Sequence, residues 1–105
     1  MKVTITKSAA EELNKKVGDQ KGYLKIQYET NRLYSGSGVA TLLFVSSKDE
    51  TEDVLFETSY RPVILEKSQM IQFDDDLTID YSDSDNSFQL RSPQQIINGR
   101  MSFIM

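Results

Sequence analysis

The chain has 105 residues with 12 Lys and Arg against 16 Asp and Glu, a formal net charge of −4, and it contains neither cysteine nor histidine. Disulfides, thiolate metal sites and thiol nucleophiles are therefore excluded, as is imidazole as a general base or metal ligand. A chain of this length is expected to form one domain, residues 1–105, because about 65% of its unfolded surface can be buried without covalent staples.

Hydropathy and charge bear on location and partners. No apolar run approaches the roughly 20 residues that span a bilayer, and the N-terminus lacks the apolar segment of a signal peptide, so we expect a cytoplasmic protein without a membrane partner. Residues 1–48 hold 8 Lys and Arg against 4 Asp and Glu, whereas residues 49–105 hold 4 against 12. The basic residues are scattered and form no stripe, so we expect no nucleic-acid partner.

The first elements predicted are a short strand and a helix. Residues 3–6 alternate valine or isoleucine with threonine, as in a strand. The segment Ser8-x-x-Glu11 matches a capping box and predicts Ser8 as the helix N-cap, with Thr6 as the alternative. Gly18 is placed to end this helix in a left-handed conformation. The apolar stripe expected to face the sheet consists of Ala9 or Ala10, Leu13 and Val17.

A hairpin over residues 23–46 is predicted to organise the fold. In residues 23–30 apolar and polar side chains alternate, which is the pattern of a half-buried strand. Residues 39–45 are almost continuously apolar, which favours a strand covered on both faces. The connection contains Gly36 and Gly38, but a strand follows this G-x-G and phosphate binding requires a helix N-terminus. We therefore expect a tight loop and no nucleotide site.

The second half of the chain predicts further strands. Residues 53–58 and 61–66 each have a strand pattern, and Pro62 stands at a strand start, where its missing N–H is tolerated. Residues 67–73 fit either a short helical turn or a continuing strand. A second hairpin is expected over residues 77–90, where apolar residues alternate on both sides of the turn sequence SDSDN.

The tail after residue 92 is less regular. Pro93 is compatible with a helix start, and Asn98–Gly99 is a breaker. The last five residues are mostly apolar and are expected to dock on the rest of the chain, because a free tail of that composition would be sticky.

No constellation of side chains indicates an active site. Asp83-x-Asp85-x-Ser87 resembles the start of a calcium loop, but Phe88 replaces the turn glycine and Gln94 the closing glutamate. A solvated turn with at most weak cation binding is expected. The serines have no histidine or S-x-x-K partner to activate them, so we expect no enzyme.

Taken in order, several local patterns resemble the HesB-like family, the A-type iron–sulphur cluster carriers. They are I-T-x-S-A-A-x-x-L at residues 5–13, the hairpin sequences GYLKIQYET and VATLLFV, SQMIQFDDDLTIDY at residues 68–81, and SPQQIINGRMS at residues 92–102. The resemblance implies a mainly β (α+β) fold, namely a small HesB-like β-sandwich or barrel of mixed strands with one N-terminal helix.

The resemblance also implies a function that depends on thiolates. Family members carry one cysteine in the loop after the second strand and a Cys-Gly-Cys near the C-terminus. Here residues 30–38 read TNRLYSGSG and residues 98–101 read NGRM, so no ligand position holds a thiol and no cofactor is expected. Ser35 and Ser37 cannot substitute, because an alcohol near neutral pH is neither deprotonated nor soft.

Two hypotheses of function follow. The first is a domain of iron–sulphur cluster biosynthesis that has lost its ligands and is kept as a protein-binding or regulatory module. The alternative is a carboxylate-based divalent metal or iron-binding protein that uses the acidic hairpin.

For the first hypothesis the expected partner is another protein or a second copy of the chain. The expected contact lies in the loop at residues 31–38, because arginine and tyrosine are enriched at interaction hot spots. Its residues are Arg32, Leu33, Tyr34, Ser35 and Ser37. The alternative is that Leu33 and Tyr34 tuck under the loop.

Overall fold

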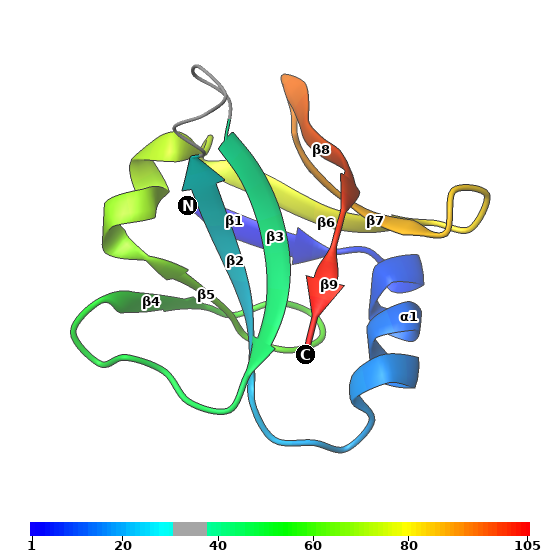
Figure 1. The fold of residues 1–105 in the computed structure, drawn as a ribbon, viewed down its shortest axis with the longest axis horizontal. Coiled ribbons are helices and arrows are strands. Elements are labelled where there is room, and N and C mark those ends of the chain that lie inside the picture. Colours follow the sequence, from blue (N-terminus) through cyan, green and yellow to red (C-terminus); the bar gives the residue numbers. More distant parts are fainter. Residues whose placement is uncertain (31–37) are drawn as a thin grey trace.

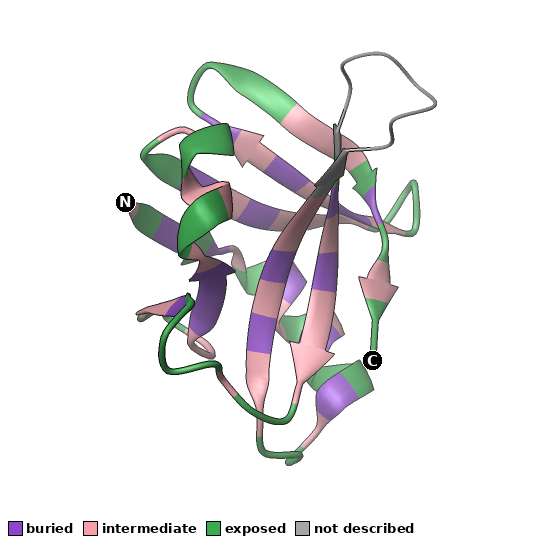
Figure 2. Ribbon diagram, turned by 60° about the vertical axis from the view of Figure 1, so that its left-hand side comes forward, coloured by how far each residue is buried: buried purple, intermediate pink, exposed green. Residues whose placement is uncertain are grey.

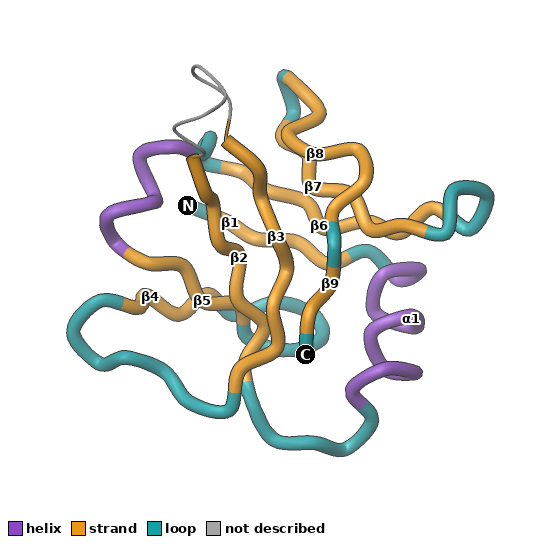
Figure 3. The backbone as a smooth tube through the Cα atoms, viewed as in Figure 1, coloured by secondary structure: helices purple, strands orange, loops and turns teal. Residues whose placement is uncertain are grey.

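The computed structural model describes residues 1–30 and 38–105 (Figure 1). Its elements are β1 (Lys2–Ile5), α1 (Lys7–Val17), β2 (Tyr23–Thr30), β3 (Gly38–Val45), β4 (Asp53–Phe56), β5 (Val63–Glu66), the 3-10 helix η1 (Lys67–Gln72), β6 (Asp76–Ser82), β7 (Ser87–Ser92), β8 (Gln95–Met101) and β9 (Phe103–Ile104). Strands dominate the tube in Figure 3, and they form one sheet in the order β1-β6-β7-β8 and another in the order β4-β5-β2-β3-β9. Both sheets are mixed, which confirms the expected mainly β, α+β class.

Helix α1 begins at a different cap from the one predicted first. Thr6 is the N-cap, with an extended backbone (φ −68°, ψ 161°), and its Oγ1 accepts from the Ala9 N–H at 3.2 Å. The prediction of Ser8 was therefore wrong and the alternative, Thr6, is right. Ser8 lies in the first turn, and its hydroxyl donates instead to Asp80 at 3.1 Å. The Thr6 hydroxyl also donates to Asp80, at 2.7 Å, so a contact that the local motif does not contain holds both hydroxyls at this end of the helix.

The other features of α1 follow the sequence closely. The predicted stripe is buried, since Ala9, Leu13 and Val17 are at most 1% exposed. Gly18 ends the helix with φ +60°, a value that favours glycine, and its N–H donates to the Asn14 carbonyl at 2.9 Å. Its ψ of −131° places it outside the left-handed helical region that we expected.

The central hairpin pairs β2 with β3 antiparallel from Tyr23↔Val45 to Thr30↔Gly38. The expectation that the second strand is covered on both faces was wrong. Ala40 and Leu42 are buried, whereas Val39 is 58% exposed. Figure 2 shows buried and more exposed positions in turn along these strands, because their sheet packs on the other sheet with one face only.

The strands that follow settle the ambiguous middle segment. Strand β4 pairs antiparallel with β5, and β5 pairs parallel with β2. Pro62 immediately precedes β5, and its carbonyl accepts from the Leu24 N–H at 3.3 Å. The segment that fitted either a turn or a strand forms η1. The side chain of Gln69 in η1 pairs with β2, accepting from the Tyr28 N–H and donating to the Tyr28 carbonyl, each at 3.0 Å.

The second predicted hairpin is also present, as β6 and β7, with Asn86 at φ 53° in its turn. Pro93, which was compatible with a helix start, does not begin a helix. The chain turns there and returns as β8, antiparallel to β7. The predicted breaker lies inside this strand. Between the pairs Leu90↔Asn98 and Phe88↔Met101, two residues of β8 face one of β7, which is a β-bulge.

The hydrophobic core lies between the facing sides of the two sheets and under α1. Its buried members are at most 9% exposed and come from eight of the elements, together with Phe73, which directly follows η1. They are Val3, Ile5, Ala9, Leu13, Leu24, Ile26, Ala40, Leu42, Val63, Leu65, Phe73, Leu77, Ile79, Phe88, Leu90 and Met101. All are apolar, so hydrophobic burial provides most of the contact between the layers.

The apolar end of the chain docks as expected. Strand β9 pairs parallel with β3, and the Leu42 N–H donates to the Ser102 carbonyl at 2.9 Å. Phe103 packs against the core, while Ile104 and Met105 remain 52% and 58% exposed. The tail thus supplies the edge strand of the larger sheet.

Among the glycines that the structure describes, Gly22 leaves the least room for a Cβ, and its substitution is a test. A Cβ there would lie 2.5 Å from the Val45 carbonyl oxygen and 2.7 Å from Phe44 Cζ. We expect Gly22→Ala to lower the free energy of unfolding by about 1–3 kcal/mol, because backbone or ring must shift. Urea denaturation measures this. Gly99→Ala is the control, because its Cβ meets only Ile96 Cγ2 at 3.7 Å. Equal effects of the two variants would contradict the packing argument.

Candidate functional site

The contact loop predicted from the sequence lies almost wholly outside the described residues. Arg32, Leu33, Tyr34, Ser35 and Ser37 fall in residues 31–37. The structure defines only the ends of this loop, Thr30 and Gly38, which pair with each other. The loop residues therefore remain a sequence-based prediction.

The tail segment Asn98-Gly99-Arg100-Met101 is described and has a structural role. The Asn98 side chain donates from Nδ2 to the Ala40 carbonyl at 2.9 Å, and its Oδ1 accepts from the Arg100 N–H at 3.0 Å. Both ends of this amide are engaged, and the first bond joins β8 of one sheet to β3 of the other. Met101 is 2% exposed and belongs to the core. Neither side chain is available to a metal ion.

Among residues 1–30 and 38–105 the carboxylates do not form a metal site either, since no group of three or more is arranged to hold an ion. Asp83 and Asp85 lie exposed in the β6–β7 turn, as expected for a solvated turn. Within the same part of the chain, no helix is long and apolar enough to cross a membrane.

One buried carboxylate, that of Asp53, has a lysine ammonium beside it. Lys25 Nζ lies 3.0 Å from Glu66 Oε1 and 3.4 Å from Asp53 Oδ1, and Asp53 is 7% exposed. Burial lowers the pKa of Lys25, but its hydrogen bond to Glu66 and the charges of both carboxylates outweigh burial and raise it. Because one ammonium serves both carboxylates, this cluster fastens β2, β4 and β5 and offers no place for a metal ion.

A second polar network joins the start of α1 to β6 and β7. Asp80 Oδ1 accepts from the Thr6 hydroxyl at 2.7 Å, the Tyr81 N–H at 2.8 Å and the Ser8 hydroxyl at 3.1 Å, and Oδ2 accepts from Arg91 Nη1 at 2.7 Å. Burial raises the pKa of Asp80, but these hydrogen bonds outweigh burial and hold the pKa below its usual value. The only base beside Ser8 among the described residues is the Asp80 carboxylate, which its lowered pKa makes a weak one, so the network is structural.

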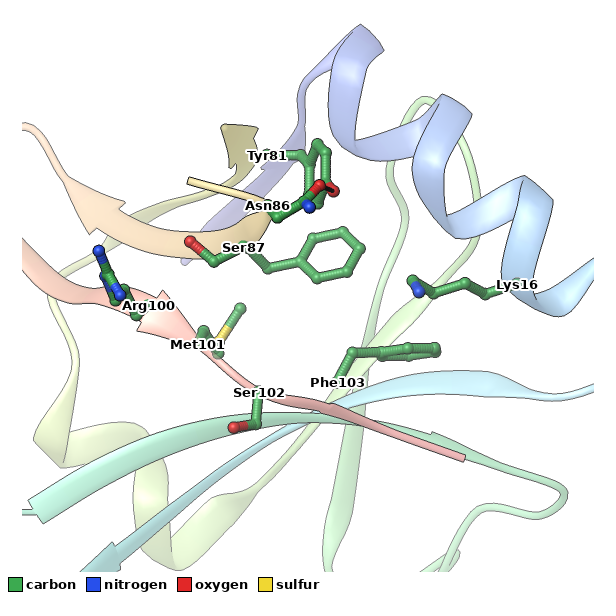
Figure 4. A pocket seen from close by; sticks show the side chains of 9 residues that line it. Lys16, Tyr81, Asn86, Ser87, Arg100, Met101, Ser102 and Phe103 are labelled. Carbon is green, nitrogen blue, oxygen red and sulfur yellow. Dashed lines mark hydrogen bonds between the residues drawn. The ribbon is translucent and has the colours of Figure 1, made fainter. Parts of the chain in front are cut away.

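A hollow of about 280 Å³ opens between the last turn of α1, the β6–β7 hairpin and the β8–β9 segment (Figure 4). Lys16, Tyr81, Ser87, Arg100 and Phe103 are among the residues that line it. Sequence reasoning missed this group. Its members are spread over 88 positions and share no motif, so only the fold brings them together.

Comparison with known proteins places these observations in a family. A family model described as "Iron-sulphur cluster biosynthesis" matches residues 1–105. The uncharacterized protein YqkB of Bacillus subtilis is 37% identical over 49 residues, and the match spans 47% of this chain and about half of that protein, 46%.

Two solved structures have similar folds. A candidate Fe-S biosynthesis protein of Lactobacillus salivarius superposes with a TM-score of 0.76 at 17% identity, covering 99% of this chain and 97% of that chain. Escherichia coli SufA, described as involved in biosynthesis of iron-sulfur clusters, superposes with a TM-score of 0.72 at 19% identity, covering 90% and 82%. At these identities the likeness concerns the fold.

The Asp80 network predicts a pH dependence of stability. The folded pKa of Asp80 is lower than the unfolded one, so its contribution is present above about pH 4 and is lost as pH falls through the folded pKa. We expect Asp80→Asn to lower the free energy of unfolding by about 1 kcal/mol at pH 7, because the charged bond to Arg91 is lost. The deficit should shrink toward pH 2, as urea denaturation at several pH values would show. Asp19→Asn, at an exposed position, is the control, and a deficit independent of pH would contradict the assignment.

Proposed function

The chain belongs to the iron–sulphur cluster biosynthesis family, and we propose that it serves there without holding a cluster, as a protein-binding or regulatory module. The observation that carries this proposal is the composition, since the whole chain contains no cysteine and no histidine. Iron–sulphur clusters are held by thiolates, with imidazole as the substitute in some centres. A member without either group lacks the chemistry on which cluster carriage depends.

The geometry of the tail supports this reading. The sequence placed the expected C-terminal ligand positions in Asn98-Gly99-Arg100-Met101. The Asn98 amide is engaged in two hydrogen bonds, the Met101 sulphur is in a core residue, and Arg100 is a cation. Asn98 instead holds the two sheets together, so the tail has a structural use that does not depend on a metal.

The alternative function, carboxylate-based binding of iron or another divalent metal, has less support. Residues 1–30 and 38–105 contain no group of three or more carboxylates suited to an ion. The buried carboxylate Asp53 already has an ammonium beside it. We infer also that the chain is not an enzyme, because residues 1–30 and 38–105 hold no nucleophile with an activating base beside it. We propose that it acts as a single cytoplasmic domain, as its length and hydropathy led us to expect.

The proposed contact with a partner is the loop that contains Arg32, Leu33, Tyr34, Ser35 and Ser37. Two exposed apolar side chains lie at the same end of the fold. Val39, 58% exposed, follows the loop directly, and Ile96, 68% exposed, lies in β8, which the Asn98–Ala40 hydrogen bond holds beside the start of β3. These side chains would extend an apolar contact surface beyond the loop.

Reconstitution tests the absence of a cluster. After anaerobic incubation with iron, sulphide and thiol and removal of unbound material, we expect the protein to be colourless, to hold less than about 0.1 iron per chain and to keep its circular dichroism spectrum, because no soft ligand is present. E. coli SufA carried through the same procedure is the positive control. A stable visible absorption spectrum together with stoichiometric sulphide would contradict the proposal.

Paired substitutions test the contact loop. Affinity capture from cells that express the tagged chain, quantified by mass spectrometry, should show partners reduced at least about tenfold in Leu33→Ser and Tyr34→Ser, because hot-spot side chains carry most of the binding energy. Ile104→Ser is the matched control, since it removes an exposed apolar side chain from β9. If the partner is a second copy of the chain, sedimentation of the same loop variants should show loss of self-association. Unchanged capture and unchanged sedimentation in both loop variants, with thermal stability retained, would rule out this surface.

A further inference from the structure

The pair Asn98–Gly99 has a chemical property that is independent of the proposed function. It is the one asparagine of the sequence that precedes a glycine, since Asn14, Asn31 and Asn86 precede lysine, arginine and serine. Asparagine is a thermolabile residue, and a following glycine has no Cβ to hinder attack of its nitrogen on the asparagine side chain. A Cβ at Gly99 would meet only Ile96 Cγ2, at 3.7 Å, so the space beside this peptide unit is open.

The reaction open to this pair is deamidation, and it needs only water. The backbone nitrogen of Gly99 attacks Asn98 Cγ, the bond from Cγ to Nδ2 breaks, and ammonia leaves with the proton that the attacking nitrogen gives up. Water then opens the resulting succinimide ring at either carbonyl. One product has aspartate at position 98, and the other has isoaspartate, in which the backbone runs through the side-chain carbon. Both products lack the amide donor.

In the folded chain the Asn98 amide is held at both ends. Nδ2 donates to the Ala40 carbonyl at 2.9 Å, and Oδ1 accepts from the Arg100 N–H at 3.0 Å. Ring closure turns the amide, and the departure of ammonia removes Nδ2, so the reaction has to break the hydrogen bond between β8 and β3. Docking of β8 on β3 therefore protects Asn98, and the reaction proceeds from an open form.

The segment that carries Asn98 is fastened by few contacts. Strand β8 lies at the edge of its sheet and contains the β-bulge, and β9 adds only Phe103 and Ile104 to the edge of the other sheet (Figure 1). Within β8, which is described throughout, Met101 alone is buried. Chain ends with few buried apolar contacts open before the whole domain unfolds, so an open form is accessible in the native protein.

We propose that Asn98–Gly99 is a deamidation site that is protected while β8 is docked on β3, and that the modified chain no longer holds this contact. A carboxylate at position 98 has no hydrogen to donate to the Ala40 carbonyl, and two acceptor oxygens that face each other repel. Isoaspartate also lengthens the backbone ahead of Met101, which is a core residue. Because the lost ammonia is not replaced, an opening that ends in deamidation is irreversible.

Mass spectrometry of the C-terminal peptides tests the protection. In mildly alkaline buffer, Asn98 of the wild type should deamidate at least about tenfold more slowly than in urea, because the rate follows the open fraction. Asn86, in the exposed β6–β7 turn, is the internal reference, and its rate should change less. Gly99→Ala should slow the reaction in urea at least about tenfold, since the new Cβ hinders the attack. Equal rates at Asn98 in buffer and urea, or an undiminished rate in Gly99→Ala, would overturn the proposal.

Hydrogen exchange tests the loss of the contact. The Leu42 N–H donates to the Ser102 carbonyl at 2.9 Å and so reports whether the end of the chain is docked. We expect this amide to exchange about tenfold faster in deamidated protein and in Asn98→Asp than in wild type, because the contact that opposes opening is lost. Asn86→Asp makes the same chemical change in the exposed turn and should leave the exchange of Leu42 unchanged. Wild-type exchange of Leu42 in the deamidated protein would overturn the proposal.

Discussion

The contact between the inner faces of the two sheets is the constraint on which the rest of this structure depends. Val3, Leu77 and Leu90 from one sheet and Leu24 and Leu42 from the other are at most 3% exposed. Because side chains alternate along a strand, a slip of one residue in either sheet would turn its apolar set outward. The register of every strand, and with it the position of each polar side chain outside the core, follows from this packing.

Polar contacts then fix details that apolar packing leaves open. Asn98 links the sheets through the Ala40 carbonyl, and Asp80 fixes the start of α1 through Thr6 and Ser8. Lys25 joins three strands through two carboxylates. The resemblance to cluster carriers led us to expect ligand positions in the tail, at residues 98–101. Here the same region is occupied by groups that bond to the protein itself, so the fold closes without a metal.

The sequence predicted the elements that depend on local pattern. Alternation over residues 23–30 and 77–90 identified both hairpins, and the positive φ of Gly18 followed from its place after the helix. Its choice of Ser8 over Thr6 as the N-cap was wrong, and Asp80, which engages both hydroxyls, is more than 70 residues away and absent from the local motif. The tail after Pro93 was compatible with a helix start, but it forms a strand because it pairs with β7. The hollow between α1 and the C-terminal strands had no sequence signal, because the residues that line it share no motif. Composition alone excluded thiolate chemistry.

We expect this family fold to be stable without an iron–sulphur cluster. Its most direct test is urea denaturation in anaerobic buffer, once with ferrous iron and sulphide and once with a chelator. We expect the same midpoint and slope under both conditions, because a ligand that does not bind the folded state cannot stabilise it. A stability that rises with iron concentration, by about 2.7 kcal/mol at 100 times a dissociation constant, would contradict it.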